Sequence, residues 1–413
     1  MKKTYTNKKS VIMIVITMFL STVTAWAENP SVKYISRECD DNYQVVEKSL
    51  SVSNYTILDG TDASKEIYLE DDAWYVVKDY EVKYSRIIVN HPNCHLILTD
   101  DAQLEAQICI PVNHTLTIYA QEGGLGRIIA HGLKNQPGIG GLDGQMGVLN
   151  IEGCYVIATG GECAAGIGGG FFGENNGLDG GIVNIYGGKV KAYGGRFGAG
   201  IGGAQNGNGG EVYIYGGNIY AGGGEDAAGI GSGENKSENS INGGTVMIYG
   251  GSVFADGRGW GAGIGAGEDA EGANVKVYGG IVEARAGGCV AVKNGGAFGS
   301  MAGENHLGTL TISDAMTVFS GSTPQNIERE FPGGERVTAC YNHPYTRIEV
   351  RAAAAKGMTF CDENETTGIS KMEDVKSLEP KAEVWYSLNG ARLTEKPTTP
   401  GIYICNGKKI AIR

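Results

Sequence analysis

The sequence predicts an all-β fold: a right-handed parallel β-helix of about eight coils followed by a small C-terminal β module. Three observations support this prediction. Glycine contributes 68 of the 413 residues and proline only 10. Short segments alternate apolar and polar residues, and one motif recurs along the chain. Glycine at this density without the three-residue period of collagen, combined with apolar alternation, indicates tight turns between strands.

The recurring motif is Gly-Ile-Gly, with successive spacings of 28, 34, 29, 34 and 34 residues. Two strand-like segments follow each copy, as in IVNIYGGKVKAYGG at residues 182–195. The longer spacings come from extended loops, which stacked coils tolerate because an insertion in one turn projects outward. The motif residues are Ile139, Ile167, Ile201, Ile230, Ile264 and the degenerate Phe298.

Alternation within each segment divides its residues between the inside and the outside of a coil. Val183, Ile185, Val190 and Ala192 are expected inside, where equivalents from successive coils would form apolar ladders. Glycine suits the intervening turns because positive φ and close backbone approach exclude most side chains. A right-handed coil is expected because parallel crossovers strongly prefer that hand.

The N-terminus has the features of a targeting segment. Four lysines precede an apolar run from Val11 to Leu20, and Ala25-Trp26-Ala27 fits a small-x-small cleavage site. We therefore expect residues 1–27 to be a signal peptide and the mature chain to be exported. The expected order is then cap strands at 28–85, β-helix repeats at 86–320, trailing strands and a linker at 321–382, and a C-terminal module at 383–413.

The repeats and their lead-in resemble a known family. GAGIGG-type repeats follow Trp74-Tyr75-Val76-Val77 and the segment from His114 to Tyr119. The match to glycine-rich secreted β-helix proteins of Bacteroidetes and some Firmicutes spans about residues 70–320. This resemblance implies a β-helix of carbohydrate-binding or adhesin-like character, with a polysaccharide or glycoconjugate surface as its partner.

The C-terminal residues are similar to a second group. Strand-like segments at 384–413 are separated by Asn389-Gly390 and Asn406-Gly407, which are typical hairpin turns. They resemble the C-terminal sorting tails of Bacteroidetes secretion systems. The resemblance implies an outer-membrane secretion machinery as partner and an extracellular or outer-membrane location in a Gram-negative bacterium. A small packing module is the alternative.

Charge and cysteine content restrict the function further. The net charge is −12, which argues against nucleic acid as a partner, since Lys and Arg neutralising phosphate drive such binding. Nine cysteines cannot all pair with one another. Cys154 with Cys163 is the most plausible bridge, and buried free thiols are an equally good interpretation. No zinc spacing occurs, and we expect neither a metal nor another cofactor.

Aromatic residues provide the candidate binding site. Tyr186, Tyr215, Tyr249 and Tyr278 each precede a Gly-Gly turn in one register, with Tyr119 related upstream. Stacked coils would place them in an outward column with a spacing of about 4.8 Å, suited to stacking on sugar rings. Such a column can also serve only to stabilise the strands. On the next strand Tyr220 and Phe254, with Tyr193, are expected to enlarge the aromatic surface.

Acidic residues recur in the loops but do not converge on one coil. Asp143, Gln205, Glu234 and Glu268 each lie four positions after a motif isoleucine, with Glu174 and Glu304 nearby. We interpret them as solvated turn carboxylates, since glycan cleavage needs an acid and a base at one linkage. The sequence thus predicts no catalytic residue and favours a non-catalytic carbohydrate-binding or adhesin-like protein. A glycan-cleaving lyase or hydrolase and a structural spacer remain the alternatives.

Overall fold

The structure is a computed structural model that describes residues 30–70, 74–141, 144–173, 177–288, 296–300, 308–333 and 343–350, and four short strands between residues 385 and 412. The expected signal peptide lies outside these residues. The chain divides into two compact units, Met1–Asn364 and Glu365–Arg413, and each is described by itself. All described elements are strands. The described residues contain no helix that is long and apolar enough to span a membrane.

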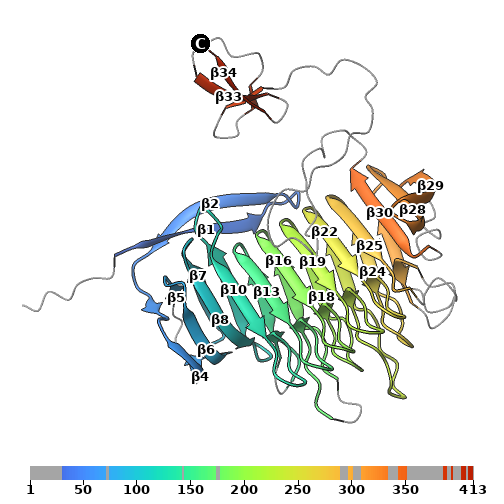
Figure 1. The fold of residues 1–413 in the computed structure, drawn as a ribbon, viewed down its shortest axis with the longest axis horizontal. Coiled ribbons are helices and arrows are strands. Elements are labelled where there is room, and N and C mark those ends of the chain that lie inside the picture. Colours follow the sequence, from blue (N-terminus) through green and yellow to red (C-terminus); the bar gives the residue numbers. More distant parts are fainter. Residues whose placement is uncertain are drawn as a thin grey trace, which may run out of the picture. The chain divides into compact units, whose positions relative to one another are not determined.

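The first unit is a stack of coils with three faces (Figure 1). One face is a path of ten strands, each parallel to and in register with the next coil. In order these are β3 (Thr56–Ile57), β5 (Trp74–Val77), β7 (Asn93–Leu98), β9 (Thr115–Ala120), β12 (Val148–Ile151), β15 (Ile182–Ile185), β18 (Glu211–Ile214), β21 (Thr245–Ile248), β24 (Asn274–Val277) and β27 (Thr309–Ile312).

The other two faces are built from the remaining strands of each coil. The second face contains β10 (Arg127–His131), β13 (Tyr155–Thr159), β16 (Lys189–Tyr193), β19 (Asn218–Gly222), β22 (Ser252–Asp256) and β25 (Ile281–Arg285). The third contains the two-residue strands β11 (Ile139–Gly140), β14 (Ile167–Gly168), β17 (Ile201–Gly202), β20 (Ile230–Gly231), β23 (Ile264–Gly265) and β26 (Phe298–Gly299). Upstream, β4 (Thr61–Leu69), β6 (Val82–Val89) and β8 (Gln103–Cys109) are longer, and β8 pairs with both β10 and β11. These early coils therefore bend one strand across two faces.

Apolar ladders fill the inside of the stack. The motif isoleucines pair in register, each on its equivalent one coil away, and Phe298 continues the same column. Every member of this column has an exposed fraction of 0%. Complete burial of one such side chain stabilises the fold by about 1.5–3 kcal/mol. The prediction of an all-β parallel β-helix is confirmed.

Antiparallel strands end the stack at its C-terminal side. β28 (Met316–Thr323), β29 (Asn326–Pro332) and β30 (Tyr345–Val350) form a small sheet, and β30 pairs antiparallel with β25. This pairing occupies backbone groups of β25 that a further parallel coil would otherwise use, so it covers an edge open to aggregation.

The segment 28–85, expected to cap the array, contains two arrangements. β3, β4, β5 and β6 already pair parallel with the coils that follow. β1 (Val32–Cys39) and β2 (Val45–Val52) instead form an antiparallel hairpin that crosses the parallel strands along the length of the stack (Figure 1). One backbone pairing, Ile35 with Ala120, joins this hairpin to the first face.

The second unit is a four-stranded antiparallel sheet in the order β32-β31-β33-β34. Its strands are β31 (Trp385–Ser387), β32 (Arg392–Leu393), β33 (Gly401–Cys405) and β34 (Lys408–Ile412). A sheet of this size holds little core, in keeping with a short attached module.

The cysteines whose surroundings are described form no disulfide. Cys154 is buried and its thiol donates to the Tyr119 carbonyl oxygen, with 3.0 Å between sulfur and oxygen. Cys163 is also a free thiol, so the suggested bridge between the two does not form. The alternative interpretation, buried thiols acting as small apolar side chains, applies to Cys94, Cys109 and Cys154.

Glycine at the third face is required by the approach of neighbouring coils. Gly231 has a φ of 142°, and a Cβ built there would lie 1.8 Å from the Gly265 carbonyl oxygen. We expect Gly231→Ala to lower the free energy of unfolding by about 2–4 kcal/mol through steric overlap and backbone strain. Gly144→Ala is the matched control, because nothing lies within 4 Å of its Cβ position. Equal denaturation midpoints for the two variants would contradict this account of the packing.

Candidate ligand-binding site

The four predicted tyrosines form one continuous column. Each follows the last residue of a first-face strand, so the parallel register places the four rings one above another. Ring centroids are 4.8 Å apart for Tyr186 and Tyr215, 5.1 Å for Tyr215 and Tyr249, and 5.2 Å for Tyr249 and Tyr278. The angles between ring planes are 8°, 4° and 15°, so neighbouring rings stack nearly parallel.

This stacking changes what the column can offer a ligand. Neighbouring rings cover much of each other's faces, and a spacing near 5 Å leaves no room for a sugar between them. The expected stacking of sugar rings therefore does not apply to the ring faces between neighbouring column tyrosines. The column presents ring edges, phenolic hydroxyls and the outer side of Tyr278, the last ring, which is 44% exposed.

One coil interrupts the aromatic column with a carboxylate. Glu152 stands between Tyr119 and Tyr186 in the column, because Ile118, Ile151 and Ile185 are register partners. Glu152 is 8% exposed, and burial raises the pKa of its carboxyl group. The main-chain N–H of Arg37 donates to it over 2.7 Å, and the Arg37 guanidinium donates to the Glu152 carbonyl oxygen. Glu152 is thus the anchor of the β1–β2 hairpin.

The hairpin continues from this anchor over the glycine turns below the column. Arg37 also pairs with Glu47 on β2, with 2.7 Å between nitrogen and oxygen. A Cβ on Gly187 would lie 2.8 Å from the Cδ of Arg37, and one on Gly216 would lie 3.6 Å from Val45. The Gly-Gly pairs that the repeats need for turning therefore also admit the hairpin.

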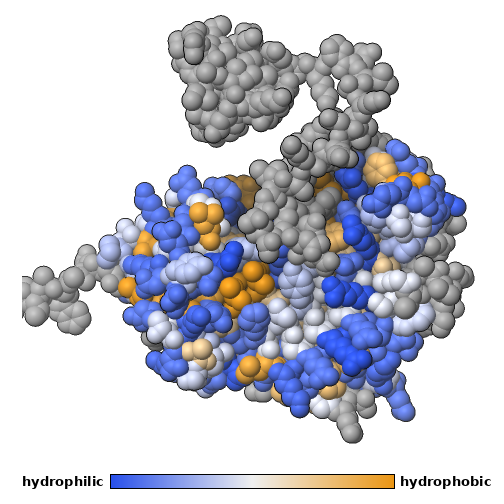
Figure 2. All heavy atoms as spheres, in the orientation of Figure 1, coloured by the Kyte–Doolittle hydropathy of each residue, from blue (hydrophilic) through white to orange (hydrophobic). Residues whose placement is uncertain are grey.

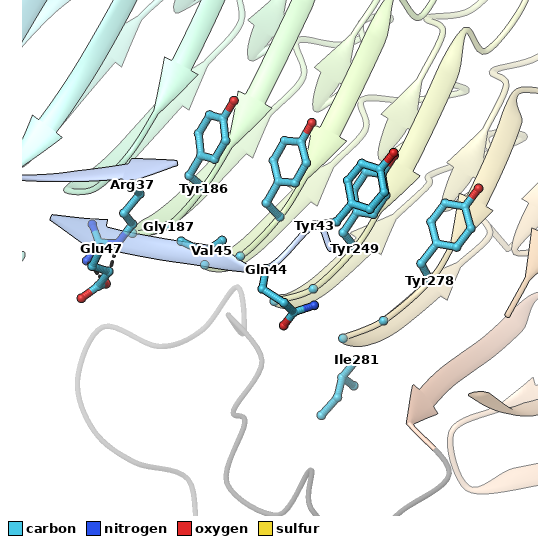
Figure 3. A pocket seen from close by; sticks show the side chains of 18 residues that line it. Arg37, Tyr43, Gln44, Val45, Glu47, Tyr186, Gly187, Tyr249, Tyr278 and Ile281 are labelled. Carbon is cyan, nitrogen blue, oxygen red and sulfur yellow. Dashed lines mark hydrogen bonds and ion pairs between the residues drawn. The ribbon is translucent and has the colours of Figure 1, made fainter. Parts of the chain in front are cut away.

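At the tip of the hairpin a fifth tyrosine joins the column. The Tyr43 ring stacks on Tyr249 with centroids 4.4 Å apart and planes at 11° (Figure 3). Tyr249 already stacks with a column neighbour on each side. The rings must therefore be offset enough to leave part of a face open to a ring from outside the column.

A groove of about 760 Å³ lies between the hairpin and the column. The four column tyrosines and the glycine pairs that follow them line one side, so the groove extends over four successive coils (Figure 3). Arg37, Tyr43, Gln44, Val45 and Glu47 line the hairpin side. Aromatic edges, bare backbone and a few polar groups in a concave site are typical of a binding groove.

The hydroxyls of Tyr186, Tyr215 and Tyr249 are neutral donors. Burial in the stack raises the pKa of Tyr215 to about 12 and raises those of Tyr186 and Tyr249. The Tyr249 hydroxyl donates weakly to the Met247 sulfur at 3.4 Å. The column therefore provides evenly spaced phenols able to hydrogen-bond a polyhydroxylated ligand.

The expected aromatic extension is not an exposed surface. Tyr220 and Phe254 pair in register on the second face, with ring centroids 5.4 Å apart. Tyr220 is 0% exposed and Phe254 7% exposed, with Tyr193 packed against them and the Arg285 guanidinium 4.4 Å from the Phe254 ring. The expectation that these two rings are available to a ligand is corrected, because alternation predicts the face of a strand but not what covers that face.

The acidic loops are also more organised than expected. Carboxylate oxygens of Asp226, Glu234 and Glu268 lie within 4.8 Å of one another. Lys236 pairs with both Glu234 and Glu268 at 2.8 Å, and Gln205 donates to Glu234 over 2.7 Å. Glu234 is 1% exposed, so its interpretation as a solvated carboxylate is wrong. Asp143, Glu174 and Glu304 lie outside the described residues. Lys236 pairs with two of the three carboxylates, which makes the cluster a structural ion-pair network.

Comparison with known proteins agrees with the coil structure. A family model described as "Beta helix repeat" matches residues 149–171, 183–205, 212–234 and 240–268. The first three matches begin at the inward residue of a first-face strand and run past the next motif isoleucine. The fold is a parallel β-helix. No curated protein and no solved structure matched the chain.

Sequence reasoning missed the hairpin side of this β-helix site. Arg37 and Tyr43 lie far from the repeats in sequence, and nothing local assigns them to the column. Two signals were present. Glu152 replaces tyrosine in the repeated Ile-Tyr-Gly pattern, which suggests a partner from elsewhere, and the Asp40–Asn42 turn separates two alternating segments.

The raised phenol pKa values predict an alkaline loss of stability. Tyrosines of the unfolded chain ionise near pH 10, whereas those of the folded column keep their protons to higher pH. The contribution of the column to the free energy of unfolding is therefore complete below about pH 10. It then falls as the pH rises toward about 12. We expect the denaturation midpoint to decline over this interval, and less steeply in Tyr215→Phe. Identical declines in both proteins would contradict the assignment to Tyr215.

Removing the lysine tests the ion-pair network. We expect Lys236→Met to lower the free energy of unfolding by about 1–3 kcal/mol near neutral pH, because it leaves Glu234 buried beside two carboxylates. Lys48→Met is the control, since Lys48 and its partner Glu38 are both largely exposed and such pairs contribute about 1 kcal/mol or less. Chemical denaturation compares the variants, and equal losses would refute a special role for Lys236.

Proposed function

We propose that the protein is exported, or displayed at a cell surface, and binds carbohydrate in the groove without cleaving it. The observation that carries this proposal is the groove itself, in which a regular array of tyrosine edges and hydroxyls faces a polar hairpin along several coils. Sugars combine apolar C–H faces with many hydroxyls, so amphipathic aromatic side chains with polar neighbours suit them.

The charges in the groove support binding over cleavage. Hydrolysis of a glycosidic bond requires two carboxyl groups about 5–9.5 Å apart across the linkage. Among the described groove-lining residues Glu47 is the single carboxylate, and it is paired with Arg37. The Asp226–Glu234–Glu268 cluster does not line the groove, and Lys236 pairs with two of its three carboxylates.

Export and display form part of the same proposal. The lysine-rich, apolar N-terminus supports a signal peptide, and the antiparallel C-terminal unit is compatible with a sorting tail. We propose that this tail engages an outer-membrane secretion machinery and leaves the β-helix facing outside. Both steps are tested with a reporter protein that follows residues 1–27 and carries residues 365–413 at its own C-terminus or lacks them. Cell fractionation then locates the reporter.

The binding test uses a glycan array and pull-down on insoluble polysaccharides with the purified full chain. We expect binding to fall about tenfold or more when Tyr186, Tyr215, Tyr249 and Tyr278 are all replaced by alanine. Replacement of the same four by phenylalanine keeps the stack and removes the hydroxyls, so it tests binding in a variant that stays folded.

Exposed tyrosines elsewhere provide the control for this experiment. Tyr80 and Tyr68 are 64% and 51% exposed and do not line the groove. Their alanine variants should bind like the parent protein. Release of oligosaccharide from bound material would move the protein to the glycan-cleaving class. Absence of binding to every glycan would leave the structural spacer as the function.

A further inference from the structure

We infer that the groove takes one uncharged, unbranched chain of sugar rings lying along the axis of the β-helix, and that Tyr43 forms the wall that holds it. This inference rests on the proposed carbohydrate binding and names the class of glycan. The direction and width of the groove, its charge and the position of Tyr43 each support it.

The repeat of the site gives the direction of the chain. Equivalent groups from four coils line the groove, each displaced by one strand spacing. The same tyrosine edge and hydroxyl therefore recur every 4.8–5.2 Å along the axis. A polymer that runs along this axis and repeats at a similar length would make the same contact at each coil. A compact ligand would use one coil and leave the others unoccupied.

The hairpin limits the width of the groove. Near Tyr186 and Tyr215 it lies directly over the glycine floor, with Arg37 and Val45 close to the Cβ positions of Gly187 and Gly216. Near Tyr278 no hairpin atom lies within 4 Å of the Cβ position of Gly279, and the last ring is exposed. A chain entering from the Tyr278 end meets a narrowing channel, which excludes bulky side branches.

The charge of the groove favours a neutral chain. Arg37 and Glu47 are the charged side chains among the described lining residues, and they neutralise each other across 2.7 Å. A uronate or sulfate polymer would have to displace Glu47 to reach the guanidinium. It would also approach a chain with a net charge of −12. On the face drawn in Figure 2 hydrophilic residues predominate, and apolar residues form separate patches.

Tyr43 shows how a ring from outside the column fits the site. It comes from a distant part of the chain, yet its plane is within 11° of that of Tyr249 at 4.4 Å. Its own side chain remains 52% exposed, and its φ of 60° is a left-handed conformation that holds the ring over the column. A sugar ring beside Tyr249 can therefore pack against the uncovered part of Tyr43.

The test is isothermal titration calorimetry of the full chain with oligosaccharide ladders of increasing length. The probes are neutral β-linked glucose, mannose and xylose series and a polyuronate series. We expect one neutral series to bind with affinity rising up to about four rings, one per lining coil, and the uronates to bind about tenfold more weakly or worse. Tyr43→Ala should weaken the preferred ligand about three- to tenfold, while Tyr43→Phe retains it.

The controls distinguish a failure of this inference from a failure of the proposed carbohydrate binding. Tyr80→Ala should leave affinity unchanged, because Tyr80 is exposed and does not line the groove. Preference for the uronate series would overturn the inference. So would full affinity in Tyr43→Ala while the fourfold alanine variant of the column loses binding. Both outcomes would leave carbohydrate binding intact, whereas failure to bind any glycan would overturn the proposed function as well.

Discussion

In-register parallel pairing between successive coils is the interaction on which the rest of this structure depends. Because each strand hydrogen-bonds to its equivalent one repeat away, every feature of one coil is copied about 4.8 Å further along. Inside the stack this produces continuous apolar columns such as the motif isoleucines. Outside it produces the tyrosine column. The core and the candidate site are two consequences of one register.

The same constraint explains the demand for glycine. Coils at strand spacing bring backbone against backbone at every corner, and a side chain would overlap the next coil at positions such as Gly231. Below the tyrosines the glycine pairs have a second consequence, since the floor they leave bare accepts the hairpin. The glycines that the chain needs for its turns thus also leave the space in which the groove forms.

The β1–β2 hairpin is the one element of the site that does not follow the repeat. Besides one backbone pairing and the packing of Tyr34 on Trp74 and Tyr119, it is joined to the first face by the contacts of Arg37 with Glu152 and of Tyr43 with Tyr249. These contacts sit where the column departs from its pattern or leaves part of a ring open. The hairpin turns a periodic surface, equally suited to stability and to binding, into a walled groove with a narrow and an open end.

The sequence by itself determined the coils, the inward residues and the register of the tyrosine column. All of these follow from alternation within each strand-like segment and from the spacing between successive repeats, both of which can be read along the chain. The groove, the burial of Tyr220 and Phe254, and the Lys236 network were decided by the tertiary structure alone. These features depend on contacts between residues that are distant in sequence. Tyr43 contacts Tyr249, about half the chain length away, and Lys236 pairs with carboxylates from two coils. Periodicity predicts which way a side chain points, but only the folded chain decides what lies opposite it.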